Sequence, residues 1–396
     1  MLAEFDGDLG ILLWQSLRNV MLWSATEPAK RKGLFSMGAE ERRRVKLLSS
    51  DVDDSLRAPL AVIARLLADP AGADRRRVAS ACQRIGEWAE ARNALATALA
   101  FTQAAALTAS TDARLSYAVG LLARQRTEYA RAETWFRRAI LLGRQSGDWE
   151  SYALAFVGLG KLYQQRGNLP SAQKAHLRAY RASRRKGLRN VQGMALHDLF
   201  VIAVERDQVR DAEEMAAAAL KAYGPGHPRL PFFAHDVAFF WMERGYFAPA
   251  ITVLTALLPH FQRPIDQALV LAHIARAAGG VHDMEQFEKS WQKAFAIVTS
   301  TEPAEKSAAV YLALAYGAGA VADWERTAAV AEKAAEIATA REEEKIKVSA
   351  EALLEAAQAK TSTPVLEEPV VESWMADHAD ALAANFARSL RVTAAR

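Results

Sequence analysis

Two His-Asp dipeptides are the residues of this sequence whose types and spacing could do chemistry. His197-Asp198 and His235-Asp236 lie 38 positions apart, and His273 follows His235 after the same interval. Two imidazoles and two carboxylates held together could ligate a metal ion or act as a general acid and base. The same dipeptide can also serve as a polar clamp between neighbouring helices or as a ligand contact. We favour the clamp or ligand contact and expect no cofactor.

Motifs of the common enzyme classes are missing from the sequence. It holds no Gly-rich phosphate loop ending in Lys-Ser/Thr, no His-Glu-x-x-His, no cysteine pair and no Gly-x-Ser-x-Gly. The single cysteine, Cys82, excludes an internal disulfide and is interpreted as a packed thiol. We therefore expect a protein that is not an enzyme. A metal-dependent enzyme built on the His197 and His235 pairs is the third-ranked alternative.

The elements that must position these dipeptides are helical repeats. A phrase recurs along the chain in steps of 37 to 41 positions: a small residue, three spacers, an aromatic or aliphatic residue, two spacers and a small residue. Such a period indicates a solenoid of helix pairs, and the alanine-rich composition favours helix. The first position of the phrase falls at Ala91, Ala132, Ala172, Ala212, Ala250, Phe287 and Thr327.

The third copy carries the fullest phrase, on Phe156, Leu159, Gly160, Tyr163, Gly167, Leu169, Ala172, His176 and Ala179. These residues resemble the signature of the tetratricopeptide repeat. Small side chains at Gly160 and Ala172 are expected where the two helices cross, since they let the backbones approach closely. The resemblance implies an all-α superhelix of about seven repeats. The long repeat is similar to that of arrays that take extended peptides in their groove.

The remainder of the chain is expected to be helical as well. Residues 1–72 are predicted to form an N-terminal bundle or cap, with helices near 8–25, 39–49 and 55–68 and a cap at Asp51 or Asp53. The repeat array is assigned to 73–340, a capping helix to 341–360, a linker to 361–371 and an amphipathic helix to 372–396. The apolar stripe of that last helix must be buried in this chain or in another; it consists of Trp374, Leu382, Phe386 and Leu390.

The N-terminus is acidic, which speaks against a signal peptide, and we expect a cytoplasmic protein. The apolar run from Leu9 to Trp23 is shorter than a bilayer span, so an integral membrane protein is not expected. We interpret the run as a buried helix. The alternative is a peripheral membrane contact with Trp14 and Trp23 at the interface.

The family resemblance also implies a binding groove lined by the first helix of each repeat. We expect it to bind another protein or an extended peptide, as a scaffold or adaptor of bacterial type. The alternative is a signalling regulator, because an N-terminal bundle followed by long repeats is similar to the bacterial Rap-type peptide-sensing regulators. The groove residues expected to contact the partner are Tyr117, Arg124, Lys161, Gln165, His197, Asp198, Phe232, His235, Asp236 and Phe239.

Charge gives a weaker signal. The net charge of +4 is small for 396 residues, so nucleic acid is not an expected partner. One basic stripe stands out on the second helix of the third repeat, at Lys174, Arg178, Arg181, Arg185 and Arg189. It could face an acidic partner or a phosphate backbone, but we favour a solvated face. Oligomer formation through the C-terminal helix is a further alternative.

Overall fold

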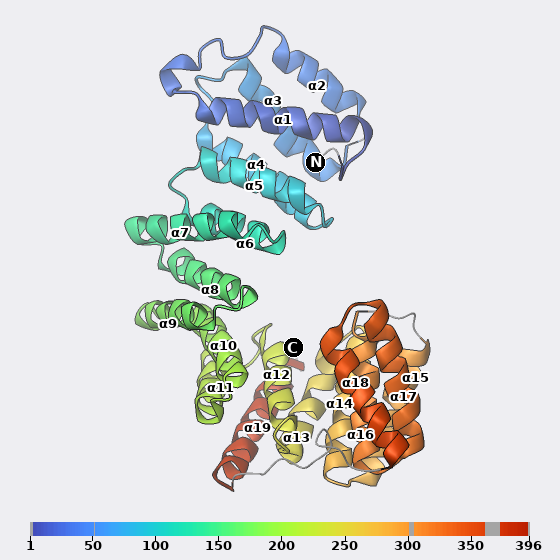
Figure 1. Ribbon diagram of the computed structural model, residues 1–396. Coiled ribbons are helices and arrows are strands. Elements are labelled where there is room, and N and C mark those ends of the chain that lie inside the picture. The colour runs from blue at the N-terminus through green and yellow to red at the C-terminus, as the bar shows by residue number, and fades with distance from the viewer. Residues whose placement is uncertain (1–2, 51, 301–304, 361–372, 395–396) are drawn as a thin grey trace. The chain divides into compact units, whose positions relative to one another are not determined.

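The computed structural model describes residues 3–50, 52–300, 305–360 and 373–394, and throughout these ranges the regular structure is helical, with no strand. The expected all-α fold of successive helix pairs is therefore confirmed. Two compact units make up the chain, and each is described by itself (Figure 1): an N-terminal unit, Met1–Ile202, and a C-terminal unit, Ala203–Arg396.

Three helices precede the repeats, at the predicted places: α1 (Gly7–Ala25), α2 (Ala39–Ser49) and α3 (Asp54–Ala68). Asp53 is the N-cap of α3, because its carboxylate accepts the Ser55 N–H at 2.9 Å. The side chain of Glu4 accepts the N–H groups of Ala96 and Thr97 at the start of α5 (Leu95–Thr108), so the N-terminal segment is tied to the first repeat.

The apolar face of α1 is turned into the protein. Trp23 is fully buried, its indole N–H donates to the Pro70 carbonyl at 2.6 Å, and the Arg31 guanidinium lies 4.2 Å from the ring centroid. The alternative of a membrane contact through Trp23 is therefore wrong, although Trp14 is 44% exposed. Among the described residues, none of the helices combines the length and the apolar character needed to cross a bilayer.

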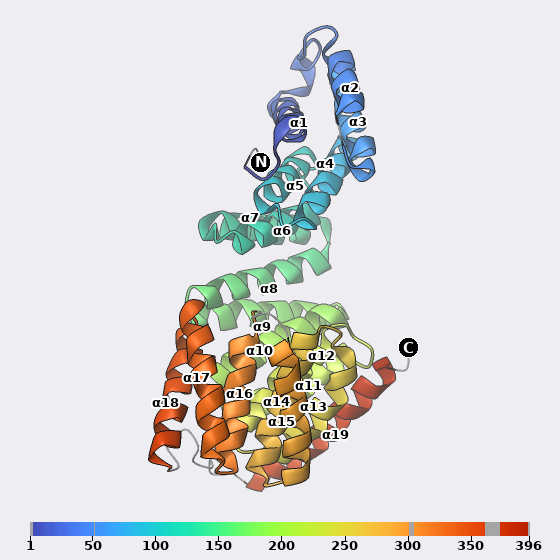
Figure 2. The same cartoon turned by 90° about the vertical axis from the view of Figure 1, so that its right-hand side faces the viewer.

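Helix pairs follow one another in both units (Figures 1 and 2). The N-terminal unit continues with α4 (Arg75–Glu90), α5, α6 (Ala113–Gln125), α7 (Tyr129–Ser146), α8 (Trp149–Gln165), α9 (Leu169–Arg185) and most of α10 (Arg189–Glu205). The C-terminal unit holds α11 (Val209–Tyr223), α12 (Leu230–Met242), α13 (Phe247–Leu257), α14 (Pro264–Gly280), α15 (Met284–Ser300), α16 (Ser307–Ala320), α17 (Trp324–Ala340), α18 (Glu344–Ala359) and α19 (Ser373–Ala394).

One left-handed residue marks the turn inside each repeat, and it fixes the register. The residues with positive φ at these turns are Asn93, Thr127, Gly167, Asp207, Gly245, His282 and Ala322. From the second repeat onward, the first position of the phrase follows five positions later. In the first repeat that position is Ala98, which is fully buried in α5. The assignment of Ala91 to this position was wrong, because Ala91 is the C-cap of α4.

The close helix crossing predicted at Gly160 and Ala172 is confirmed. A Cβ atom on Gly160 would overlap with the imidazole ring of His176, which is fully buried beside the fully buried Ala172. The neighbouring crossings use the same device, since a Cβ on Gly120 would meet Phe136. Small residues thus let the paired helices approach closely enough for the larger residue to fill the space beside the contact.

The apolar stripe of the C-terminal helix is buried within this chain. In α19, Leu382, Phe386 and Leu390 are at most 5% exposed, and α19 packs against α13 (Figure 1). The Phe386 ring centroid lies 5.7 Å from that of Phe233 and 6.5 Å from that of Trp241 in α12. The side chain of Trp374 and the predicted linker 361–371 lie outside the described residues.

Candidate partner-binding surface

One face of α12 exposes aromatic side chains to solvent. Phe232 is 59% exposed and Phe239 is 40% exposed, with Asp236 exposed and His235 half-buried on the same stripe. Burying a phenyl ring is favourable, and large apolar side chains gathered on one surface mark a place where a partner can bind. The stripe therefore distinguishes α12 as a candidate binding element.

Aromatic rings from neighbouring segments continue this face. The Phe232 ring lies 5.8 Å from the Phe261 ring, in an edge-on arrangement. On α14, the His273 ring lies 5.0 Å from His235 and 5.6 Å from Phe239. The His235 Nε2 and His273 Nδ1 atoms share a hydrogen bond of 3.1 Å. The two helices are thus joined at this face by tilted ring contacts and one polar contact.

Arg276 extends the same surface toward α16. Its guanidinium donates to Glu243 Oε1 at 2.6 Å, and lies 4.1 Å from the Tyr316 ring and 5.9 Å from the Phe239 ring. A cation held over aromatic faces is ordered without losing its hydrogen-bonding capacity. We call this surface the aromatic wall; it consists of Phe232, His235, Phe239, His273, Arg276 and Tyr316.

The histidine pair in the aromatic wall is electrostatically constrained. His273 is 5% exposed, and burial holds the pKa of its imidazole well below the usual value, with His235 and Arg276 adding to the effect. His273 is therefore neutral near pH 7. The carboxylate of Asp236 lies next to the pair, with its Oδ1 atom 3.9 Å from His235 Nδ1. The hydrogen bond between the two rings suits a positioning or recognition role.

Part of the N-terminal unit matches a known family. The sequence model described as "Tetratricopeptide repeat" matches residues 111–185, which span α6 to α9. Residues 111–185 are tetratricopeptide repeats.

Solved structures give more distant likenesses. The pilF protein of Pseudomonas aeruginosa is 14% identical, with 57% of this chain and 95% of that chain covered and a TM-score of 0.46. Aspartyl phosphate phosphatase F from Bacillus subtilis is 9% identical, with 91% and 96% covered and a TM-score of 0.38. A Rap protein complexed with Competence and Sporulation Factor is 8% identical, with 89% and 97% covered and a TM-score of 0.35. No curated protein matches the sequence.

In the N-terminal unit, the His197-Asp198 dipeptide has a different environment from that of His235-Asp236. Asp198 is 7% exposed; its Oδ1 pairs with Lys161 Nζ at 3.0 Å, and its Oδ2 lies 3.5 Å from His176 Nδ1. The pKa of His176 is lowered because burial opposes its charged form more than Asp198 favours it. Asp198 therefore acts as a polar clamp between α10, α8 and the buried imidazole, and it holds Lys161 in place.

The other predicted contacts of the N-terminal unit lie on the first helices of successive helix pairs. Tyr117 is half-buried, 6.0 Å from the Phe136 ring, Arg124 is half-buried, and Gln165 is exposed. His197 is half-buried on α10. Because His197 and His235 belong to separate units, their expected juxtaposition stays a prediction.

The tertiary structure gives His235 a partner that the dipeptide pattern did not select, His273 in the next repeat. Within the described residues, no group of three or more His, Cys, Asp or Glu side chains is placed to hold a metal ion. Three members of the aromatic wall were missed as site residues: His273, Arg276 and Tyr316. The signal for His273 was its interval of 38 from His235, which repeats that between His197 and His235.

Acidification is expected to destabilise the C-terminal unit. A histidine in an unfolded chain has a pKa of about 6.5, whereas the pKa of the buried His273 is well below that value. Below about pH 6.5 the unfolded state therefore binds a proton that the folded state does not bind. Stability should therefore be full above about pH 6.5 and fall as the pH is lowered toward the depressed pKa of His273. Urea unfolding curves between pH 7.5 and 5 measure this slope.

His273→Gln should flatten that slope, since glutamine does not titrate. His282→Asn is the matched control, because His282 is exposed and its left-handed backbone conformation suits asparagine. An unchanged slope in His273→Gln, or an equal change in His282→Asn, would contradict the assignment.

Proposed function

We propose that this chain is a protein-interaction module, without catalytic activity of its own, that binds a peptide segment of a partner protein on the aromatic wall. The observation that carries the proposal is the pair of exposed phenyl rings, Phe232 and Phe239, set beside a histidine pair and an ordered arginine. Aromatic residues and arginine contribute most of the binding energy in protein interfaces. The tetratricopeptide repeats of residues 111–185 support an interaction role for the chain.

The spacing of the anchors indicates the kind of ligand. Phe232 and Phe239 are seven residues apart on α12, which places them roughly 10 Å from each other along the helix. An extended peptide places side chains of the same face about 7 Å apart, so apolar residues two or four positions apart, roughly 7 or 13 Å, bracket the spacing of the two rings. Arg276 and His235 supply polar groups for backbone carbonyls or a carboxylate of the same peptide.

Alanine at both Phe239 and His235 is expected to weaken peptide binding by roughly 10- to 100-fold, since the loss of each hot-spot side chain costs about 1 kcal/mol or more. The probe is a set of dodecapeptides selected from a random phage-displayed library on the full-length chain. Fluorescence anisotropy with each selected peptide gives the dissociation constant for the wild type and the double variant.

The matched control is Val348→Ala, which removes an exposed apolar side chain from α18, outside the aromatic wall. Its dissociation constants should stay within about 2-fold of the wild type, as expected for a surface site away from the interface. If the selected peptides bind the Phe239/His235 double variant as tightly as the wild type, the proposed surface is the wrong one.

The signalling alternative, a regulator of the peptide-sensing type with its output in residues 1–72, stays a prediction. The buried apolar face of α1 and the capped start of α3 account for the structure of that segment without indicating an output. The cytoplasmic location and the bacterial source are likewise predictions from the sequence.

A further inference from the structure

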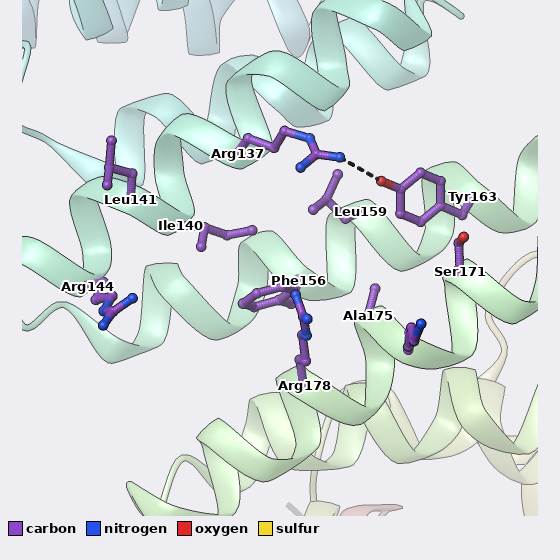
Figure 3. A pocket seen from close by; sticks show the side chains of 11 residues that line it. Arg137, Ile140, Leu141, Arg144, Phe156, Leu159, Tyr163, Ser171, Ala175 and Arg178 are labelled. Atoms are coloured by element: carbon purple, nitrogen blue, oxygen red, sulfur yellow. Dashed lines mark hydrogen bonds between the residues drawn. The ribbon is translucent and has the colours of Figure 1, made fainter.

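A second surface, in the N-terminal unit, combines positive charge with an apolar floor. Between α7 and α9 lies a pocket of about 390 Å³ whose floor is formed by α8 (Figure 3). We call it the basic pocket and define it by four cations, Arg137, Arg144, Lys174 and Arg178, and by the floor residues Phe156 and Leu159. Its volume lies within the range of pockets that enclose ligands of a few side chains in size.

The positive charge of the basic pocket is largely uncompensated. Arg137 pairs with Glu133 at 2.8 Å and also donates to Tyr163 Oη. In the part of the chain that the structure describes, no carboxylate lies within 4 Å of Arg144, Lys174 or Arg178, and no acidic residue lines the pocket. Three cations without carboxylate partners attract an anion to this place, most strongly at low ionic strength.

The arrangement of the cations distinguishes between kinds of anion. Arg137 and Arg144 are seven residues apart on α7, roughly 10 Å along the helix, and Lys174 and Arg178 are four apart on α9, roughly 6 Å. The two helices form two rims of the pocket, with Arg137 on one rim and Arg178 on the other (Figure 3). A single phosphate is bound by cations that converge on one point. Cations spread along two rims instead match several carboxylates distributed along a segment.

The floor of the basic pocket supplies an apolar contact between the two rims. Phe156 is 6% exposed, and the Arg178 guanidinium lies 5.6 Å from its ring centroid. At the edge of the pocket Leu141 is 56% exposed, without an apolar cover. A ligand that places one apolar side chain against this floor would bury both surfaces while its charged groups remain at the rims.

We propose that the basic pocket binds an acidic peptide segment of a partner protein, in which an apolar side chain is flanked on both sides by carboxylates. The apolar side chain packs on Phe156 and Leu159, and the carboxylates pair with the cations of α7 and α9. Two members of the basic stripe, Lys174 and Arg178, thereby have a role beyond solvation. This site is independent of the aromatic wall, which lies in the other unit.

The test uses the full-length chain and an array of dodecapeptides with a central Trp or Leu and two Glu residues on each side at varied spacings. Matched arrays replace every Glu by Gln, or the central residue by Ser. The variant is Lys174→Glu with Arg178→Glu. The control is Arg181→Glu with Arg185→Glu, which makes the same charge change on exposed positions of the same helix outside the pocket.

The best acidic peptide is expected to lose affinity at least 10-fold in Lys174→Glu/Arg178→Glu and less than about 3-fold in the control, by fluorescence anisotropy at two salt concentrations. The Gln and Ser arrays should bind weakly, and Phe239→Ala/His235→Ala should bind like the wild type. Equal losses in the two charge-reversed variants would overturn the proposal, as would an array with no binder. A short RNA duplex bound in place of any acidic peptide, and lost in Lys174→Glu/Arg178→Glu, would also overturn it.

Discussion

Replacing Phe386 with alanine is expected to lower the free energy of unfolding of the C-terminal unit by about 3 to 5 kcal/mol. Phe386 is fully buried, and its ring packs between Phe233 and Trp241. Alanine would leave a cavity lined by two rings that are held by α12, and such surroundings relax only in part. Urea unfolding followed by circular dichroism measures the loss.

The effect should extend beyond one side chain, because α19 also carries a polar contact. His378 Nδ1 lies 2.9 Å from Glu213 Oε2, and the other oxygen of this buried carboxylate accepts the Trp241 indole N–H at 2.5 Å. Loosening α19 would deprive Glu213 of one of its partners, which is costly for a buried polar group.

Val392→Ala is the control for Phe386→Ala, since Val392 lies on the same helix and is 44% exposed. Its cost should be within about 0.5 kcal/mol, as for most surface substitutions. If Phe386→Ala is as mild as Val392→Ala, α19 does not dock in the way the structure shows.

Gly160→Val is expected to destabilise the N-terminal unit by about 3 kcal/mol, the upper part of the range for overpacking. Any Cβ at this position overlaps with the His176 ring, and that ring is fully buried with its Nε2 atom 3.1 Å from Gln164 Oε1. The ring therefore has no room to withdraw, and the helices α8 and α9 must separate. Thermal and urea unfolding of the purified variant give the loss.

A double variant separates this clash from other effects of the substitution. In a His176→Ala background the ring is gone, so the additional cost of Gly160→Val should fall below about 1 kcal/mol, because valine has no helix-propensity disadvantage relative to glycine. Strict additivity of the two substitutions would contradict a direct contact between residues 160 and 176.

The fold was accessible from the sequence because its determinants are local and recur. The spacing of small residues such as Ala132 and Ala172 identifies the second helix of each pair, and the N-cap Asp53 marks the start of α3. The register failed in the first repeat, where Ala91 fits the phrase through Leu95 and Ala98, whereas Ala98 is followed by Thr102 at the aromatic or aliphatic position. The left-handed backbone at Asn93 decides for Ala98, and asparagine is one of the residues that tolerate it.

The candidate surfaces were accessible only in part. The exposed stripe of α12 falls at the positions that the family resemblance implies for the groove, so Phe232, His235 and Phe239 were selected from the sequence. The side chains that surround them were not selected from the sequence, because His273, Arg276 and Tyr316 come from later repeats. Asp198 was selected for the same reason as Asp236, yet it is buried against Lys161 and His176 while Asp236 is exposed.

By itself the sequence determined the helices, their pairing and the face that each helix buries, because backbone hydrogen bonding, capping and 3.6-residue periodicity act within one helix or one repeat. Only the tertiary structure decided what covers each face. The stripe of α19 required burial but did not specify that α12 and α13 bury it. The basic pocket needs cations from α7 and α9, whose approach depends on the packing of α8 between them. Contacts between distant segments are set by shape and packing, which no local pattern encodes.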